Sequence, residues 1–154
     1  MQHTLLNTIR WFVRAVPEPE TKNINVQTGV HFEEVGEMLD EMIGTTPEAH
    51  KLIREANEAV KALAKYLKTS DEVLKYEVCS HKKLLDALCD QVVTGTGTAH
   101  MWGYDMLKGM DTVNASNFSK FVDGEPVFDA NRKVMKGPDY FEADLAPYVQ
   151  NPRF

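Results

Sequence analysis

Apolar side chains recur at intervals of three or four residues along most of the chain up to Met110, the spacing that places them on one face of a helix. The segments that carry this pattern first are residues 4–16, about 25–43 and 46–67, and each is predicted to be a helix. Pro17 ends the first, and residues 18–24 are predicted to form a linker, because proline cannot continue a helix. Gly44 ends the second, and Thr46 caps the third.

The same pattern predicts a further helix after the third. Ser70 or Asp71 supplies its cap, and apolar residues then recur as far as Val92. Residues 94–98 alternate threonine and glycine, which are poor helix formers, and therefore predict a kink or a break. A short helix over residues 100–107 is expected to follow.

Beyond Met110 the long periodicity is lost, and glycine, proline and asparagine become frequent. This part of the chain predicts one short helix near residues 112–121. A small hairpin is expected at Asp123 and Gly124, because such pairs favour tight turns. An extended tail follows.

Together these elements predict an all-α fold, an antiparallel helical bundle with a four-helix core over about residues 4–110 and an irregular tail over 111–154. A chain of 154 residues is expected to form one domain over 1–154, and dimerisation would bury its remaining apolar faces. Hydrophobic residues make up 43% and charged residues 26% of the chain, which is typical of a globular protein rather than a disordered one.

Charge and cysteine content restrict the expected partners and compartment. A net charge of -6 argues against general affinity for nucleic acid, which usually requires a basic surface. No apolar run approaches the roughly 18 residues that a membrane helix needs, so a soluble protein without a membrane partner is expected. Cys79 and Cys89 form no CxxC motif and no secretory leader precedes them, which favours free thiols in the cytoplasm.

Two groups of acidic residues lie within the helical patterns. Glu33, Glu34 and Glu37 belong to the second helix, and Asp86 and Asp90 belong to a later one. Residues three or four apart on a helix are neighbours, so each group brings carboxylates together that repel one another. If the two helices pack together, a cation is needed to keep all of these groups ionised. Mg²⁺ or Mn²⁺ is the natural candidate, since both prefer carboxylate and water oxygens.

Each acidic group also has a structural interpretation. Glu33, Glu34 and Glu37 are alternatively a solvated face of their helix. Asp86 and Asp90 are flanked by apolar residues and are therefore expected to be buried. A buried carboxylate needs a ligand or a basic partner, so a salt bridge is the alternative to a metal ion there.

Other chemistries lack a matching motif. The sequence has no ExxH pair of the kind found in di-iron bundles, no GxSxG nucleophile motif and no Walker or dinucleotide loop. We therefore interpret His31 and His81 as ordinary histidines, and Gly95 and Gly97 as positions of close helix packing.

Several segments resemble one family. Gly29–Met38 is similar to the EExxE helix of the all-α nucleoside triphosphate pyrophosphohydrolases, the MazG-like group that includes phosphoribosyl-ATP pyrophosphohydrolase and dimeric dUTPases. Asp86–Asp90, with Gly97–Ala99, looks like the second acidic helix of that family, usually written ExxD. Asn114–Lys120 and Lys133–Pro138 are similar to the SNMSK and KGP segments of phage and bacterial members, and this pair is the most specific part of the resemblance.

The resemblance covers most of residues 18–145. It implies a Mg²⁺- or Mn²⁺-dependent hydrolase that cleaves a nucleoside triphosphate between its α and β phosphates. The products are a nucleoside monophosphate and pyrophosphate. The implied partners are the nucleotide substrate and further copies of the chain, as a homodimer or a dimer of dimers.

The family's metal ligands fall on Glu34, Glu37 and Asp90. Ala87 stands where the ExxD motif has its glutamate, and Asp86, one position earlier, is the nearest acid that could replace it. The number of metal ions is therefore left open: Asp86 would be a fourth ligand, and Glu33 and Asp86 would serve a second ion or orient water.

The remaining implied roles concern the attacking water and the substrate. Glu33 is the first choice to accept the proton of the water, a role that requires a carboxylate not fully occupied by metal. The implied substrate-binding residues are Asn23, Gln27, Asn114, Asn117, Ser119, Lys120 and Lys136. Lys120 and Lys136 would meet the outer phosphates as point charges, and Asn117 or Ser119 would donate hydrogen bonds.

Asn23 and Gln27, with Asn25 and Trp11, are the candidates to contact the base or the ribose. Surface solvation is the alternative interpretation of the two lysines. For the whole chain, the alternatives are a non-catalytic helical binding module that has lost full metal binding, for which Ala87 is the signal, and a different metal-dependent phosphoesterase.

Overall fold

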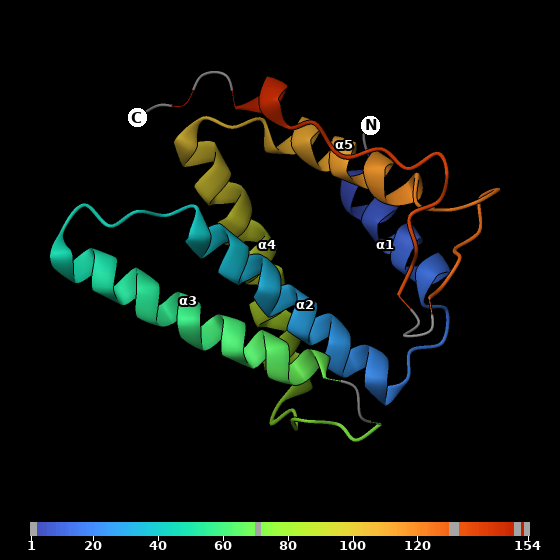
Figure 1. Ribbon diagram of the computed structural model, residues 1–154, viewed down its shortest axis with the longest axis horizontal. Helices are drawn as coiled ribbons and strands as arrows, with labels where there is room; N and C mark the ends of the chain where they lie inside the picture. Colours follow the sequence, from blue (N-terminus) through green and yellow to red (C-terminus); the bar gives the residue numbers. More distant parts are fainter. Residues whose placement is uncertain (1–2, 70–71, 130–132, 150–151, 153–154) are drawn as a thin grey trace. The chain divides into compact units, whose positions relative to one another are not determined.

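The computed structural model describes residues 3–69, 72–129, 133–149 and 152. Within these ranges the chain forms five α-helices and no strand, so the prediction of an all-α fold is confirmed. None of the described helices is both long enough and apolar enough to cross a membrane. In chain order the elements are α1 (Thr4–Ala15), α2 (Thr21–Asp40), α3 (Pro47–Lys68), α4 (His81–Trp102), α5 (Met106–Phe118) and the 3-10 turn η1 (Ala146–Tyr148) (Figure 1).

The chain divides into two compact units. The hairpin unit, Glu18–Glu77, contains α2 and α3, which lie side by side as an antiparallel pair joined by a short connection (Figure 1). The tail unit, Met1–Pro17 with Val78–Phe154, contains α1, α4 and α5, and α1 packs beside α5. The predicted four-helix core and the single domain over residues 1–154 stay predictions.

α1 and α3 lie close to the bounds that the sequence predicts. α1 ends at Ala15, just before Pro17, as a proline-terminated helix should. At the start of α3, the Thr46 hydroxyl accepts the backbone N–H of Ala49 (3.1 Å), and Pro47 occupies the first turn. Both devices suit a helix start, because they satisfy or remove N–H groups that have no partner within the helix.

α2 begins earlier than predicted. The linker prediction over residues 18–24 is wrong beyond Glu20, because the helix starts at Thr21. The reason is a local cap: the side-chain oxygen of Asn23 accepts the backbone N–H of Glu20 (2.8 Å), one half of a capping box. The segment lacks apolar periodicity, so the pattern alone could not reveal this start.

The start of the fourth helix is also later than predicted. Ser70 and Asp71, the predicted caps, lie outside the described residues. Residues 72–80 are not helical, and α4 begins only at His81, where the Ser80 hydroxyl accepts a backbone N–H of the first turn (3.4 Å). The predicted helix start near residue 71 is therefore wrong.

Asn25 of α2 accounts for the non-helical segment. Its side chain is only 1% exposed, donates to the Val73 carbonyl (2.8 Å) and accepts the Lys75 N–H (3.0 Å). The hydroxyls of Thr28 and Tyr76 lie 2.7 Å apart and fasten the same segment to α2. Backbone groups that bind a side chain of α2 are not free to form helical hydrogen bonds.

α4 continues without interruption through residues 94–98, so the predicted break there is wrong. Each of the threonines in this run donates its hydroxyl hydrogen to the carbonyl oxygen one turn earlier, at 2.7 to 3.0 Å. These bonds satisfy the hydroxyl groups within the helix, which allows threonine in a helix interior.

The two short helices predicted over residues 100–107 and 112–121 have different bounds in the structure. α4 continues to Trp102 and ends at Gly103, whose φ of 83° is left-handed, the usual end of a helix. A single helix, α5, then covers Met106–Phe118.

The hairpin predicted at Asp123 and Gly124 is present. These two residues have φ values of 51° and 79°, as a two-residue hairpin turn requires. Val122 and Glu125 on either side exchange both backbone hydrogen bonds, at 2.8 and 2.9 Å. The predicted turn is therefore confirmed.

The tail runs back along α5 (Figure 1). The Gly137 N–H binds the Lys120 carbonyl just beyond the C-terminal end of α5 (3.1 Å), and the Asp105 N–H at the N-terminal end of α5 binds the Tyr148 carbonyl (3.0 Å). Residues 137–148 therefore cover one side of α5 along its whole length.

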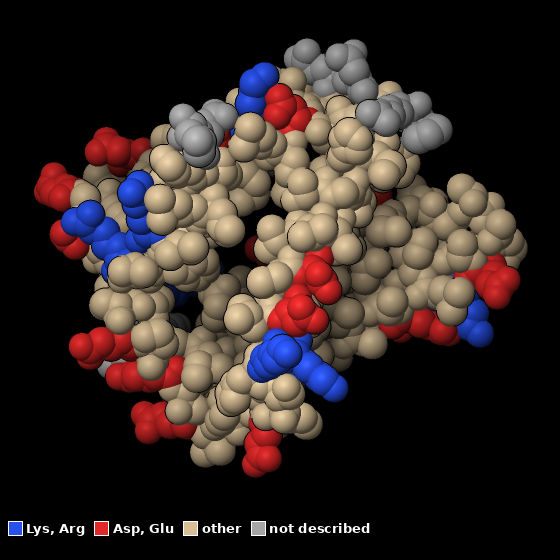
Figure 2. Space-filling view, turned by 180° about the vertical axis from the view of Figure 1, so that it is seen from behind, with Lys and Arg blue, Asp and Glu red and all other residues tan. Residues whose placement is uncertain are grey.

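Few apolar side chains are buried. Among the described residues, the buried apolar side chains are Ala15, Ala64, Leu67 and Phe121. No residue of α4 is buried, and its Leu85 and Val93 are 63% and 67% exposed. Figure 2 shows a face on which large areas carry no charged side chain. The described residues thus leave much apolar surface for further packing.

Candidate functional site

Two glycines bring α2 and α3 close together. Gly29 and Gly36 lie seven residues apart on α2, and both are buried against α3. A methyl group at Gly29 would lie 2.7 Å from the Lys68 side chain and 2.9 Å from the Ala64 carbonyl oxygen. At Gly36 it would lie 3.1 Å from the Lys61 side chain. The lack of a side chain at both positions therefore permits the close approach.

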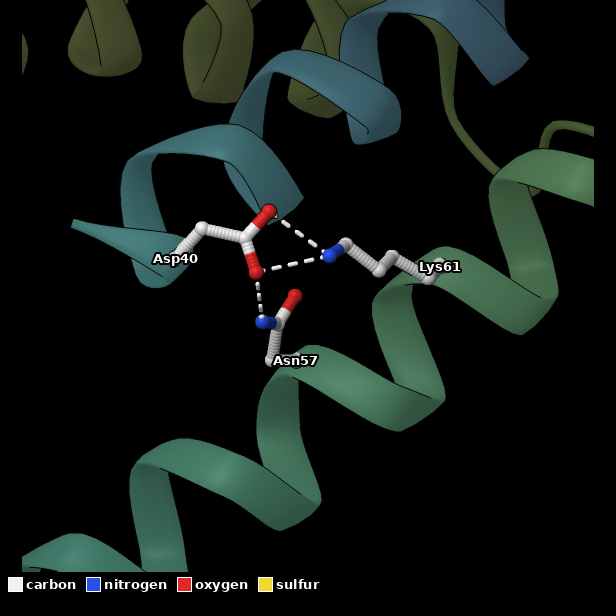
Figure 3. A network of polar contacts seen from close by, with 3 residues as sticks. All are labelled: Asp40, Asn57 and Lys61. Carbon is white, nitrogen blue, oxygen red and sulfur yellow. Dashed lines mark hydrogen bonds and ion pairs between the residues drawn. The ribbon is translucent and has the colours of Figure 1, made fainter. Parts of the chain in front are cut away.

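Lys61 and Lys68 of α3 reach across these glycines to acids of α2. Lys68 Nζ donates to Glu33 Oε1 at 2.5 Å. Lys61 Nζ lies 2.7 and 2.6 Å from the two carboxylate oxygens of Asp40, and Asn57 Nδ2 donates to the same carboxylate at 2.7 Å (Figure 3). The same group of three residues therefore occurs twice: a glycine of α2, the lysine of α3 that faces it, and an acid one turn further along α2.

The Asp40 carboxylate is stabilised in its charged form. The hydrogen bonds from Lys61 and then Asn57 lower the pKa of Asp40 below its ordinary value. The Asp40 and Lys61 side chains are 43% and 49% exposed, so the ion pair is a surface contact that fixes the helix register more than it stabilises the fold.

An open groove of about 550 Å³ follows the same side chains between α2 and α3. Its charged lining consists of three carboxylates and three lysines: Glu33, Glu37, Asp40, Lys61, Lys65 and Lys68. Glu37 makes no ion pair or side-chain hydrogen bond with any described residue. It is therefore the acid of this groove that is available to an added cation.

Within the predicted EExxE group, Glu33 and Glu37 both line this groove. Glu33 turns toward α3, where Lys68 holds it. Glu34 is exposed and projects about 100° further round the helix. Glu34 and Glu37 are three residues apart and therefore neighbours on one flank of α2, as the predicted metal ligands must be.

Asp86 and Asp90 lie one turn apart on α4, and both are exposed. The expectation that they are buried is wrong, because the flanking Leu85 and Leu88 are themselves 63% and 43% exposed. Neither carboxylate forms an ion pair or a side-chain hydrogen bond within the described part of the chain. Burial therefore creates no need for a partner here.

The donor chemistry of these acids fits a hard divalent cation, because all of them offer carboxylate oxygens. Across residues 3–69, 72–129, 133–149 and 152, however, no three His, Cys, Asp or Glu side chains are grouped so that they could hold an ion. The acids of α2 belong to the hairpin unit and those of α4 to the tail unit. The metal site stays a prediction.

The SNxSK and KGP segments lie against each other. The Gly137 N–H donates to the Lys120 carbonyl at 3.1 Å. Ser116 Oγ donates to the Phe141 carbonyl (2.8 Å), and Ser119 Oγ accepts the Phe141 N–H (3.1 Å) while donating to the Ser116 carbonyl (2.7 Å). Both serine hydroxyls therefore fasten the tail to the end of α5.

The two predicted phosphate-binding lysines flank this joint. Lys136 precedes Gly137, which binds the carbonyl of Lys120, and Lys136 Nζ lies 4.4 Å from the Tyr140 ring centroid. Lys120 Nζ donates to the side-chain oxygen of Asn117 at 2.8 Å. Each ammonium group is thus held by a neighbouring side chain.

Three other predicted substrate contacts have different surroundings. Asn114 is 4% exposed, donates to the Thr4 carbonyl (3.0 Å) and accepts from the Thr8 hydroxyl (2.9 Å), so its amide joins α5 to α1. Asn23 caps α2 through its side-chain oxygen. Gln27 is exposed on α2. Contact of these three with a substrate stays a prediction, and the amide of Asn114 is already used within the chain.

Sequence reasoning missed Lys61 and Lys68 as partners of the α2 acids. Both lysines come from the facing helix, α3, so their pairing with the acids of α2 does not follow from the sequence of α2. The signal that could have revealed them is the shared seven-residue spacing of Gly29 with Gly36 and of Lys61 with Lys68.

The motif residues alone carry the family resemblance. Comparison of the chain with protein-family models, with curated proteins and with solved structures finds no match.

Proposed function

We propose that this protein is a metal-dependent nucleoside triphosphate pyrophosphohydrolase that releases a nucleoside monophosphate and pyrophosphate. The observation that supports this best is the joint between the two most specific motif segments, where the Gly137 N–H binds the Lys120 carbonyl. Lys120 and Lys136 both belong to that joint. Two lysines whose backbone segments meet at one end of a helix suit a ligand that carries several phosphates.

Carboxylates are the proposed metal ligands. Glu34 and Glu37 of α2, with Asp86 and Asp90 of α4, would hold Mg²⁺ or Mn²⁺, in keeping with the oxygen preference of these ions. A bound ion neutralises phosphate charge and lowers the pKa of a coordinated water. Glu33 is proposed to accept the proton of the attacking water, and its ion pair with Lys68 fixes the direction of its carboxylate.

A non-catalytic helical binding module is the second candidate. It is favoured by Ala87 at the glutamate position of the ExxD motif and by the lack of three grouped metal ligands among the described residues. Such a module would keep the fold and bind no divalent ion at these acids.

A homodimer in the cytoplasm is proposed for either candidate. The apolar side chains of α4 that are at least 40% exposed include Leu84, Leu85, Leu88, Val92 and Val93. A patch of this kind is typical of an interaction surface, and a second copy would cover it. Cys79 and Cys89 are free and exposed, which suits a reducing compartment. Sedimentation at several protein concentrations tests the proposed homodimer. A dimer is expected, and a monomer at all concentrations would contradict the proposal.

Nucleotide hydrolysis in three matched variants tests the enzyme proposal. Glu37→Gln and Asp90→Asn should each reduce Mg²⁺-dependent turnover about 100-fold or more, since each removes a charged oxygen proposed to bind the ion. Asp40→Asn is the control, because it removes a carboxylate of α2 that already binds Lys61. Mn²⁺ binding, followed by electron paramagnetic resonance, should weaken in the first two variants only.

Melting temperatures measured on the same samples separate loss of chemistry from loss of fold. Retained turnover in both Glu37→Gln and Asp90→Asn would contradict the assignment of the metal ligands. A stable wild-type protein that binds no Mn²⁺ and hydrolyses no nucleotide would favour the binding module.

A further inference from the structure

Trp11 of α1 contacts the end of α5 beside the proposed phosphate-binding lysines. Its indole Nε1–H donates to the Asn117 carbonyl at 2.9 Å. Its ring stacks on Phe121, with centroids 5.9 Å apart and 12° between the planes. The indole is therefore fixed by one hydrogen bond and one buried aromatic neighbour.

Asn117 links this tryptophan to Lys120. Its carbonyl oxygen accepts from the indole of Trp11, and its side-chain oxygen accepts from Lys120 Nζ at 2.8 Å. Lys120 Nζ also lies 5.9 Å from the Trp11 ring centroid, within reach of a cation–π interaction. A flexible lysine side chain is thus held between the amide of Asn117 and the face of an indole.

Trp11, Asn117 and Lys120 meet at the C-terminal end of α5, where the helix carbonyl groups affect the approach of an anion. The last carbonyl groups of a helix lack partners within the helix and carry the negative end of its dipole. A phosphate that approaches them is repelled unless a donor occupies the carbonyl and a cation lies in front of it. The Asn117 carbonyl already accepts the backbone N–H of Lys120 at 3.3 Å, and the indole of Trp11 adds a second and shorter hydrogen bond at 2.9 Å. The Lys120 ammonium supplies the cation.

We propose that Trp11 is a positioning residue, which directs the Lys120 ammonium toward a phosphate group of the substrate and adds a second donor to the Asn117 carbonyl at the end of α5. This inference rests on the proposed function in one respect, the binding of a polyphosphate by Lys120. Phenylalanine at this position would keep the ring packing on Phe121 and lose the N–H donor. The role therefore depends on the indole nitrogen as well as on the ring.

Kinetics of Trp11→Phe test the role. The variant should raise KM for the nucleotide about three- to tenfold and leave kcat within about twofold, as expected for a loss of ground-state binding to a displaced lysine. Trp102→Phe is the matched control, because it is the same substitution at a different place. Trp102 stacks on Tyr104 at the end of α4. The control should retain wild-type KM.

Pyrophosphate binding supplies a readout that does not depend on turnover or on a change at Trp11. The chain has two tryptophans, so Trp102→Phe leaves Trp11 as the single fluorophore. Inorganic pyrophosphate with Mg²⁺ should change the Trp11 fluorescence of this protein, and adding Lys120→Ala should abolish the change. If calorimetry shows that pyrophosphate binds but the Trp11 fluorescence does not change, the inference is overturned.

The two proposals fail in different ways. If Trp11→Phe binds pyrophosphate and nucleotide as the wild type does, while Lys120→Ala weakens both, the positioning role is wrong and the hydrolase remains. If the wild type releases pyrophosphate but Lys120→Ala leaves KM unchanged, the inference is likewise overturned. If the wild type releases no pyrophosphate from any nucleotide, the proposed function fails, and the inference fails with it.

Discussion

The two units hold their helices together in different ways. In the hairpin unit, Gly29 with Lys68 and Gly36 with Lys61 repeat one contact at a seven-residue interval along α2 and α3. In the tail unit, α1 joins α5 at successive turns through polar contacts between different residue types, such as Thr8 with Asn114 and Trp11 with Asn117. A repeated pair of residue types can be inferred from spacing, whereas contacts between different residue types cannot.

The difference also affects the candidate site. Glu34 and Glu37 lie on a regular helix whose register is fixed by repeated contacts, so their direction follows from helix geometry. Lys120 and Lys136 lie where a helix ends and a tail returns, and single hydrogen bonds fix them there. Variants that remove one contact should therefore act locally in the tail unit and along the whole helix pair in the hairpin unit.

Asn114→Ala should have the largest effect on stability. The side chain is buried, and its loss removes two hydrogen bonds between α5 and α1, one to the Thr4 carbonyl and one from the Thr8 hydroxyl. We expect a decrease of about 2–4 kcal/mol in the free energy of unfolding, measured by urea denaturation. Hydrogen exchange should accelerate in α1 and leave α2 and α3 unchanged. Equal acceleration in all of these helices would contradict the local character of the contact.

Gly29→Ala should have an intermediate effect. The added methyl group would meet the Ala64 carbonyl oxygen at 2.9 Å, and backbone atoms cannot move aside as a side chain can. We expect a loss of about 1–2 kcal/mol, the cost of overpacking less the better helix propensity of alanine. Gly36→Ala is the matched control, since its methyl group meets only the flexible Lys61 side chain at 3.1 Å and the Asn57 oxygen at 3.5 Å. The control should change the free energy of unfolding little. A larger loss in Gly36→Ala than in Gly29→Ala would show that contact with the backbone oxygen is not what decides the cost.

Asp40→Asn should have a smaller effect than either of these, and one that depends on pH. Because hydrogen bonds from Lys61 and Asn57 lower the pKa of Asp40 in the folded state, its contribution is present above the ordinary pKa and is lost as the pH falls through the folded value. The melting temperatures of wild type and variant should therefore differ at neutral pH and converge in acid, as the pH falls below the ordinary pKa of an aspartate.

Glu125→Gln provides the same test in the tail unit. Arg14 lowers the pKa of Glu125 through one hydrogen bond and its charge, whereas Asp40 has two donors. The difference in melting temperature between wild type and variant should have the same sign and pH dependence for both variants. It should be smaller for Glu125→Gln. A difference that grows toward acid pH would contradict the sign for either residue.

Features of the fold that depend on local signals can be predicted from the sequence, whereas features that depend on distant residues cannot. The end of α1, the start of α3 and the turn at Asp123 are predictable because a proline, a threonine cap and a turn dipeptide act locally. The non-helical segment before α4 is not, because it depends on Asn25, whose partners lie far along the chain. A side chain that binds a distant backbone leaves no periodic signal.

The candidate site divides likewise. The neighbouring positions of Glu34 and Glu37 on one flank of α2 followed from their spacing. The ion pair of Glu33 with Lys68 was not foreseen, because it crosses between helices. The prediction that Asp86 is buried is wrong, because apolar neighbours along a helix indicate burial only where they are buried themselves, and those of α4 are exposed.

Product identification from a panel of nucleoside triphosphates tests the proposed chemistry most directly. The wild-type protein should, with Mg²⁺ or Mn²⁺, release a nucleoside monophosphate and pyrophosphate in equal amounts from at least one nucleotide, as resolved by chromatography. Chelation of the metal should stop the reaction. Release of orthophosphate alone, or no product from any nucleotide with a folded protein, would contradict the assignment as a pyrophosphohydrolase.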